Sequence, residues 1–416
     1  MAIQGNLAVN RDRLWDSLEE MAKIGATAKG GCNRQTLTDL DGQGRRLFQQ
    51  WCEAAGMTVS TDSMGDMFAR REGADPALDP VAVGSHLDTQ PTGGKYDGVL
   101  GVLAALELVR TLNDLEIQTE HPIEIVNWTN EEGARFAPAM LASGVFAGVY
   151  EEAWAKALTD RDGLVFGEEL RRIGFEGPLP VGHRSFHAFF ELHIEQGPIL
   201  ETEGIDIGIV THAQGLCWLD VVVKGQDSHA GTTPMPRRQD AMVAAARMIS
   251  AIEDIAQEHA PDAVGTVGYV SAAPGSRNVI PGQADFTVDL RHPKQDALDA
   301  MRGAFEQRVS EIAAANGVVA EIAPVEAHEP VAFDEACLAR LRSAAEALGL
   351  SHRDMISGAG HDACHIASVA PTAMIFCPCV DGLSHNEAEA ITPDWAAAGA
   401  NVLLRAAVET AGIVDR

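Results

Sequence analysis

The sequence predicts an α/β protein in which a second, smaller domain is inserted into the first. At 416 residues the chain is longer than one ordinary hydrophobic core accommodates, which indicates two domains. Short apolar strand patterns alternate with helical patterns in 1–211 and again in 330–416, as in a largely parallel sheet flanked by helices. Over 212–329 the order becomes strand-helix-strand-strand-helix-strand, which resembles a ferredoxin-like α+β unit.

The individual elements follow from periodic apolar residues, as where Leu47, Phe48 and Trp51 fall at helical spacing before Gly56. In the outer segments the expected helices are 45–56, 98–112 and 393–412, and the expected strands are 81–84, 123–127, 189–194 and 372–377. In the middle segment the expected strands are 218–223, 264–270 and 284–290, and the expected helices are 239–258 and 295–316. Functional groups in such α/β sheets gather on the loops beyond the strand ends.

Charge and composition exclude several classes of partner. The formal net charge of −29 argues against nucleic acid and anionic membranes, which are bound by Lys/Arg patches. Seven irregularly spaced cysteines include no CxxC pair, so we expect reduced thiols and a cytoplasmic location. The sequence has no signal-peptide pattern and no apolar run of the roughly 18–20 residues that a membrane span needs.

A set of His, Asp and Glu residues stands beside glycines at the ends of predicted strands. They are His86 and Asp97 in GSHLDTQPTGGKYDG, Glu131 and Glu132 in NWTNEEG, His193 in ELHIEQG, and His385 in GLSHNEAE. Neutral imidazole and carboxylate oxygen are ligands for Zn²⁺ and similar cations. A pair of such ions, roughly 3.5–4 Å apart, needs a carboxylate that bridges them. Asp88, two residues after His86, is placed to orient that imidazole with its carboxylate.

Each of these residues also has an ordinary structural explanation. A single histidine at a strand end is more often structural or solvated than a ligand, and Asp97-Gly98 is a favoured turn dipeptide. The adjacent pair Glu131 and Glu132 is by itself typical of a solvated surface. Their occurrence in order, each after an apolar strand, favours a metal centre.

Six motifs together resemble the M20-type metallopeptidase superfamily: GSHLDT, KYDG, NEEG, HIEQG, DSHAG and GLSHNEAE. The sequence is most similar to its zinc-dependent hydantoinase/carbamoylase branch, which contains N-carbamoyl-L-amino-acid hydrolases, β-ureidopropionases and allantoate amidohydrolases. The resemblance covers nearly the whole chain. It implies a metallopeptidase-like catalytic domain, 1–211 with 330–416, and a lid or dimerisation domain over 212–329 through which the chain forms a homodimer.

The resemblance also implies a role for each metal-site residue. His86 and His193 would hold one divalent ion, Glu132 and His385 the other, and Asp97 would bridge the two. Glu131 would be the general base, because a carboxylate beside the ions can take a proton from water and pass it to the leaving nitrogen. Zn²⁺ is the implied metal, with Mn²⁺, Co²⁺ and Ni²⁺ as alternatives.

The substrate-binding residues implied by the resemblance are Gln196 for the ureido group, His229 for the oxyanion, Asn278 and Arg291 for a carboxylate, and Gly360 for backbone contact, with His361 nearby. An Arg fork suits a small carboxylate-bearing substrate because it binds carboxylate through two hydrogen bonds. His229, Asn278 and Arg291 belong to the inserted domain, so either domain closure or a partner subunit must bring them to the metals.

Several of these residues have alternative explanations. Arg291 would equally suit a pair with a surface acid, and His229 would suit a turn. His361, His365 and Asp362 form another candidate ligand cluster. We expect them to support the site from outside, because the five-ligand set is already complete.

His193 decides between the expected activities. Peptidase members of the superfamily usually carry a carboxylate there, whereas histidine is typical of the carbamoylase branch. The expected reaction is therefore hydrolysis of an N-carbamoyl-L-amino acid or N-carbamoyl-β-alanine to amino acid, CO₂ and ammonia. The alternatives are an allantoate amidohydrolase, an N-acyl amino acid or dipeptide hydrolase, and a catalytically inactive binding protein that keeps the fold. The last would be marked by loss of a ligand or of Glu131, and all are present.

Overall fold

A computed structural model describes residues 7–414, which form two compact units. The first contains the chain up to Thr211, Ala332–Met355, and the chain from Gly360 onward. The second contains His212–Val331 and the short return Ile356–Ala359. The pattern of apolar residues placed the second boundary at 329/330 and did not predict the return, because that segment continues directly from a strand of the first unit.

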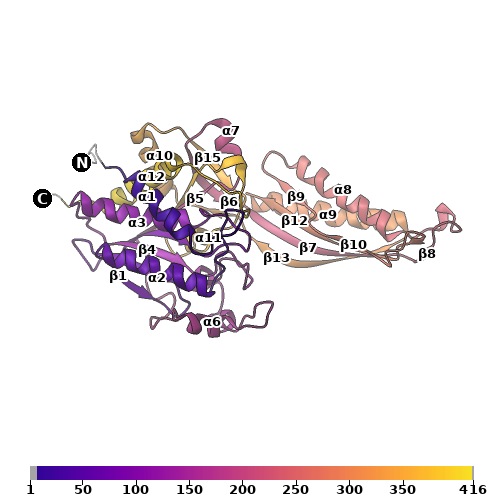
Figure 1. The fold of residues 1–416 in the computed structure, drawn as a ribbon. Helices are drawn as coiled ribbons and strands as arrows, with labels where there is room; N and C mark the ends of the chain where they lie inside the picture. Colours follow the sequence, from indigo (N-terminus) through magenta and orange to yellow (C-terminus); the bar gives the residue numbers. More distant parts are fainter. Residues whose placement is uncertain (1–6, 415–416) are drawn as a thin grey trace. The chain divides into compact units, whose positions relative to one another are not determined.

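The first unit is organised around a nine-stranded sheet (Figure 1). In spatial order its strands are β1 (Thr58–Thr61), β2 (Met67–Arg71), β4 (Ile123–Trp128), β3 (Val81–His86), β5 (Ala188–Ile194), β16 (Thr372–Cys377), β6 (Ile207–Ala213) and β14 (Val331–Ala332), with β15 (His352–Ser357) also paired to β6. The α/β fold class predicted from the sequence is confirmed.

Parallel and antiparallel pairs are mixed in this sheet, whereas the sequence predicted a largely parallel one. β3 runs parallel to β4 and β5, and β5 runs parallel to β16. β1 pairs antiparallel with β2, β2 with β4, and β6 with β16. The loop from β1 to β2 spans only 62–66, too short for the crossover that a parallel pair needs, so these two strands form a hairpin.

The helices of the first unit are α1 (Arg11–Ala22), α2 (Asp39–Ala54), α3 (Val99–Asp114), α4 (Leu141–Phe146), α5 (Glu152–Lys156), α6 (Phe166–Ile173), α7 (Ile199–Glu203), α10 (Glu335–Leu348), α11 (Asp362–Ile366) and α12 (Pro393–Ala411). α3 and α12 pack against each other and against the central strands β3 and β5. Most of their side chains are buried, because apolar residues occupy nearly the whole helix circumference. The packing of these two helices against β3 and β5 holds the end of the loop between β3 and α3 in place. This loop carries part of the candidate site.

The main sheet and helices of the second unit follow the predicted βαββαβ order, with one predicted strand split in two and with a separate two-stranded ladder that was not predicted. Its elements are β7 (Gly215–Lys224), β8 (Ser228–His229), α8 (Ala241–Glu258), β9 (Val264–Thr266), β10 (Val270–Ala273), β11 (Val279–Ile280), β12 (Gln283–His292), α9 (Gln295–Asn316) and β13 (Val319–His328). The main sheet is ordered β10-β12-β7-β13 with antiparallel pairing, and α8 and α9 bury its alternate apolar residues. The strand expected over 264–270 is two short strands, both paired to β12 and separated by 267–269.

Two further expectations concern the chain as a whole. Within residues 7–414, no helix combines the length and the apolar character that crossing a bilayer requires. All seven cysteines are free thiols, and six of them are buried.

Candidate metal centre

The parallel strands bring three of the predicted segments to one edge of the sheet. β3 ends at His86, which lies opposite Trp128 at the end of β4, and the NEEG segment follows directly. In β5, His193 lies opposite Phe376 near the end of β16. Parallel strands end at a common edge, so residues distant in sequence converge there.

Two groups of possible ligands share Asp97. His86, Asp97 and His193 form a buried group, and Asp97, Glu132 and His385 form a more exposed one. Asp97 Oδ1 lies 3.0 Å from His193 Nε2 and 3.7 Å from His86 Nε2, while Asp97 Oδ2 lies 3.4 Å from His385 Nε2. The two oxygens of one carboxylate thus face different groups, as expected for a residue that bridges two cations.

The imidazoles of the buried group are oriented for metal binding. His86 Nδ1 donates to the Asp88 carbonyl at 3.0 Å, and His193 Nδ1 donates to the Ile194 carbonyl at 2.9 Å. These bonds place the hydrogen on Nδ1 and leave Nε2 as the ligand atom. His86 Nε2 is buried without a hydrogen-bond partner among the described residues. Burial lowers the pKa of His86, which favours the neutral form that a metal requires.

Asp88 supports the site by a different route from the one predicted. Its carboxylate lies 3.8 Å from His86 Nδ1, beyond hydrogen-bond distance, and its backbone carbonyl orients the ring instead. The carboxylate oxygens accept the backbone N–H groups of Glu131 and Glu132, each at 3.3 Å. Asp88 therefore connects the end of β3 to the Glu131-Glu132 segment.

The two adjacent glutamates point to different neighbours. Glu131 Oε2 lies 3.4 Å from His86 Nε2, and Glu132 Oε2 lies 3.3 Å from His385 Nε2. Gln90 Nε2 also donates to Glu132 Oε2 at 2.7 Å. Burial, followed by the charges of Asp362 and Glu132, holds the pKa of Glu131 well above its ordinary value. Glu131 is thus a buried carboxyl group that binds a proton readily, next to the ligand groups.

Gln196 turns its amide group toward the shared carboxylate. Its Nε2 donates to Asp97 Oδ2 at 2.9 Å and to Ser384 Oγ at 3.1 Å. Because a carboxylate only accepts, the nitrogen must be the atom on that side. Gln196 Oε1 is buried with no hydrogen-bond partner in the part of the chain that the structure describes. The residue therefore presents an acceptor oxygen next to the ligand groups.

Gly98 makes room for the first histidine ligand. A Cβ on Gly98 would lie 2.3 Å from the His86 ring, and its φ of +67° is unfavourable for other residues. The Asp-Gly dipeptide therefore serves the turn into α3 and the close approach of His86 at once.

His361 and Gly360 also belong to the first unit. The His361 ring is buried, with its centroid 4.6 Å from that of His193. Glu191, His193 and His361 form a third possible ligand group, which overlaps the buried one. Glu191 is already bonded to the Ser85 hydroxyl and to the backbone N–H of Ala363. Gly360 packs against Met140.

The other three predicted substrate residues lie in the second unit. His229 and Asn278 are neighbours at the β8–β11 ladder, where Ala230 N–H donates to the Asn278 carbonyl. Arg291 lies on β12 and binds Asp289 through Nε and Nη2, and its Nη1 donates to the Gly358 carbonyl at 2.7 Å. The predicted approach of these residues to the metal ligands remains a prediction.

Sequence reasoning missed two residues that contact the shared aspartate or its loop. Ser384 Oγ lies 2.9 Å from Asp97 Oδ2, and Glu389 accepts the backbone N–H of Asp97 at 3.1 Å. Both belong to the GLSHNEAE motif, so the motif was the available signal. It did not show which of its acidic residues turns inward.

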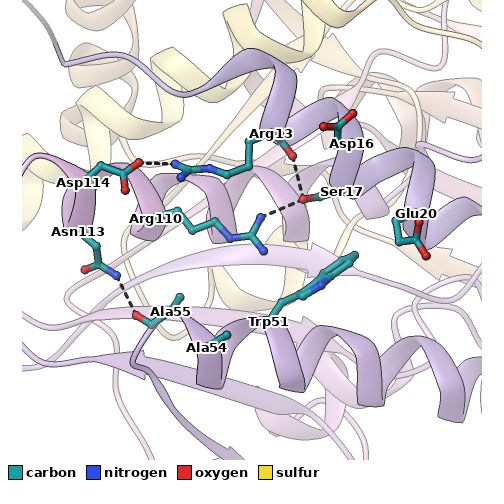
Figure 2. Close-up of a pocket in the computed structure, with 10 residues that line it drawn as sticks. All are labelled: Arg13, Asp16, Ser17, Glu20, Trp51, Ala54, Ala55, Arg110, Asn113 and Asp114. Carbon is teal, nitrogen blue, oxygen red and sulfur yellow. Dashed lines mark hydrogen bonds and ion pairs between the residues drawn. The ribbon is translucent and has the colours of Figure 1, made fainter.

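A cavity of about 580 Å³ between α1, α2 and α3 is a separate feature (Figure 2). Arg110 projects into it, bonds Ser17 through Nη1, and lies 5.8 Å from the Trp51 ring centroid. None of the predicted site residues lines this cavity. The ligand groups at the sheet edge contain the predicted metal-site residues and are the candidate site.

Comparison with known proteins agrees with this geometry. Residues 82–409 match the family described as Peptidase family M20/M25/M40. The chain belongs to the M20 family. An N-carbamoyl-L-amino-acid amidohydrolase of Rhizobium meliloti is 58% identical over 416 residues, covering 100% of both chains. A ureidoglycolate hydrolase of Arabidopsis thaliana is 35% identical, covering 96% of this chain and 87% of the relative.

A solved structure places this M20 protein in one branch of the family. The amidase of the hydantoinase/carbamoylase family from Burkholderia multivorans has a TM-score of 0.95 and 55% identity, covering 97% of this chain and 98% of that one. The predicted membership of the hydantoinase/carbamoylase branch is confirmed. The protein is accordingly a hydrolase of C–N bonds outside peptides, from a family that uses divalent metals.

Proposed function

We propose that this protein hydrolyses the carbamoyl group of an N-carbamoyl-L-amino acid, giving the amino acid, CO₂ and ammonia, with two divalent ions per chain. The observation that carries the proposal is Asp97, whose two carboxylate oxygens face two separate ligand groups. The full-length similarity to an N-carbamoyl-L-amino-acid amidohydrolase supports the substrate class. Zn²⁺ is the proposed metal, because the groups combine imidazole with carboxylate.

Different residues of the chain transfer the proton and bind the ureido group. Two divalent ions, when bound, supply the Lewis acidity that activates water and polarises a carbonyl. Glu131 takes the proton of the attacking water and delivers it to the leaving nitrogen, a role supported by its position 3.4 Å from His86 Nε2. Gln196 Oε1 accepts an N–H of the ureido group, since it is an acceptor without a partner among residues 7–414.

Two residues of the second unit bind the oxyanion and the substrate carboxylate in this proposal. His229 Nδ1 accepts the backbone N–H groups of Gly231 and Thr232, so its hydrogen is on Nε2 and is available to an oxyanion. Among the described residues, the contacts of Arg291 use three of its five N–H groups. One N–H on each terminal nitrogen remains for a substrate carboxylate, and Asn278 assists.

The proposal includes a homodimer formed through 212–329 and a cytoplasmic location. β13 is an edge strand of the second unit, and it exposes Val319 and Val325 by 60% and 56%. Exposed apolar residues on an unpaired edge favour association with another chain. The seven free thiols support a reducing compartment. Light scattering at two protein concentrations would test the dimer, and a monomer at both would contradict it.

A second candidate is a ureido carboxylate such as allantoate or ureidoglycolate. The relatives from Arabidopsis thaliana and Oryza sativa, both 35% identical, are named ureidoglycolate hydrolases. The same ligand groups would serve, and only the pocket would differ. The greater identity to the carbamoyl amino acid enzyme favours the first candidate.

Ammonia release from four substrates distinguishes the candidates. Metal-loaded enzyme is assayed with an N-carbamoyl-L-α-amino acid, N-carbamoyl-β-alanine, allantoate and ureidoglycolate. Turnover of the carbamoyl-L-amino acid above the other three is expected. Turnover confined to allantoate or ureidoglycolate would establish the second candidate. Inactivity on all four with metal bound would contradict both, and N-acyl amino acids and dipeptides would then be assayed.

A further inference from the structure

Glu389 is a buried carboxylate that joins two loops of the metal centre. It is 4% exposed and lies four residues after His385. Its Oε1 accepts the backbone N–H groups of Tyr96 and Asp97 at 3.0 and 3.1 Å. Its Oε2 lies 3.2 Å from Ser384 Oγ. The side chain therefore connects the KYDG loop to the loop that carries His385.

These contacts reach both the backbone and the surroundings of the Asp97 carboxylate. The backbone of Asp97 is held by Glu389, and its Oδ2 lies 2.9 Å from the Ser384 hydroxyl. Ser384 in turn lies between the two carboxylates. Glu389 thus holds the main chain of Asp97 directly, and it contacts Ser384, which together with Gln196 holds the outer oxygen of Asp97.

The segment that leads into KYDG approaches the Glu389 side chain closely. A Cβ on Gly94 would lie 1.9 Å from Glu389 Cδ, so only glycine permits this approach. A side chain that merely filled space would not need the loop backbone at such short range. The fit indicates that the loop conformation and the carboxyl group depend on each other.

The two ligand groups differ in how much they depend on Glu389. In the buried group, His86 and His193 are oriented by the carbonyls of Asp88 and Ile194, on strands or at their ends. In the exposed group, His385 has 51% side-chain exposure and adjoins Ser384. Removal of Glu389 would therefore disturb the exposed group while leaving most of the buried group in place.

We propose that Glu389 is a positioning residue that holds Asp97 in its bridging orientation and selectively supports the metal position formed by Asp97, Glu132 and His385. The inference rests on the two-ion proposal above. Groups that orient metal ligands from outside typically change metal affinity by roughly 10–100-fold when removed. We expect removal of Glu389 to reduce the affinity for only one of the two ions.

The test is Co²⁺ binding to metal-free protein, followed by competition with a chelator and by the visible absorption of Co²⁺. Wild type is expected to bind two ions. Glu389→Ala is expected to bind the first ion as wild type does and the second at least roughly tenfold more weakly, with an altered spectrum for the second ion. Ser384→Ala should show the same selectivity to a smaller degree, which keeps the test informative if Glu389→Ala does not fold.

Two further variants separate positioning from general stability. Glu389→Gln should restore both ions, because its amide oxygen accepts the two backbone N–H groups and its nitrogen donates to Ser384. Glu387→Gln is the matched control, since its carboxylate lies 3.5 Å from Lys29 and should leave both ions unchanged.

The outcomes are distinguishable. Two ions bound equally well by wild type, Glu389→Ala and Ser384→Ala would overturn the role of Glu389 and leave the proposed function standing. Equal weakening of both ions would also overturn it, because Glu389 would then stabilise the unit as a whole. A wild-type chain that binds a single ion would refute the two-ion proposal itself, together with this inference.

Discussion

At the scale of single residues, the site depends on consecutive side chains that contact different histidines. Glu131 and Glu132 are consecutive, yet one lies beside His86 and the other beside His385. Asp88 holds the backbone of both through its carboxylate. A proton-transferring group can therefore stand next to the ligands without being one of them.

Replacing Glu131 with Gln tests that division. The variant should keep the metal content of wild type and lose roughly 10²–10⁴-fold in kcat, because the amide cannot take up the proton. Metal analysis and ammonia release measure the two effects. Glu132→Gln is the matched comparison and should lose metal instead. Wild-type turnover by Glu131→Gln would remove Glu131 from the role of base.

At the scale of elements, α2 is tied to the segment that carries the glutamates. Arg45 is 1% exposed and donates through Nε to Asp41, through Nη1 to the Gly65 carbonyl, and through Nη2 to the Thr129 hydroxyl. Thr129 follows β4 and comes two residues before Glu131. The buried guanidinium thus links a helix, a hairpin loop and the end of a central strand.

Arg45→Ala should destabilise the first unit by about 3–5 kcal/mol, because it leaves the buried Asp41 carboxylate without its partner. Urea unfolding followed by circular dichroism measures the change. Arg46→Ala is the control on the same helix, since Arg46 is exposed, and it should change stability by less than about 0.5 kcal/mol. Equal stability of the two variants would show that the buried pair contributes nothing.

Local patterns predicted the elements better than they predicted pairing. The bounds 295–316 and 372–377 agree with α9 and β16, because α9 has apolar residues at helical spacing before Gly317 and β16 is a short apolar run between two prolines. The antiparallel pairs β1–β2, β2–β4 and β6–β16 were missed, since strand direction depends on loop length and tertiary contacts. The break at 267–269 was missed because Val267 and Tyr269 are residue types favoured in strands, like those on either side.

The ligand set was predictable because its motifs contain glycine and lie at the ends of buried strands or in the loops that follow them. Glu389 was not, because the contact that defines it joins residues 292 positions apart. The same holds for Asp88, whose carboxylate reaches Glu131, 43 positions away, in place of its neighbour His86. Local patterns identify candidate side chains, and the fold decides which of them meet.

At the scale of the whole molecule, the proposal requires residues from both units to act on one substrate. Arg291→Ala should raise the KM for carbamoyl-L-amino acids by roughly tenfold or more, because it removes charge-assisted hydrogen bonds to the carboxylate. Arg302→Ala is the control, since Arg302 pairs with Glu306 on α9. Steady-state kinetics measure both variants. An unchanged KM in Arg291→Ala would show that the carboxylate is held elsewhere.

The most direct test of the central claim is to titrate metal-free protein with Zn²⁺ while measuring ammonia release from an N-carbamoyl-L-amino acid. Activity should be absent without metal and should reach its plateau at two ions per chain, because Asp97 joins two ligand groups. Full activity without metal, or a plateau at one ion per chain, would contradict the two-ion mechanism.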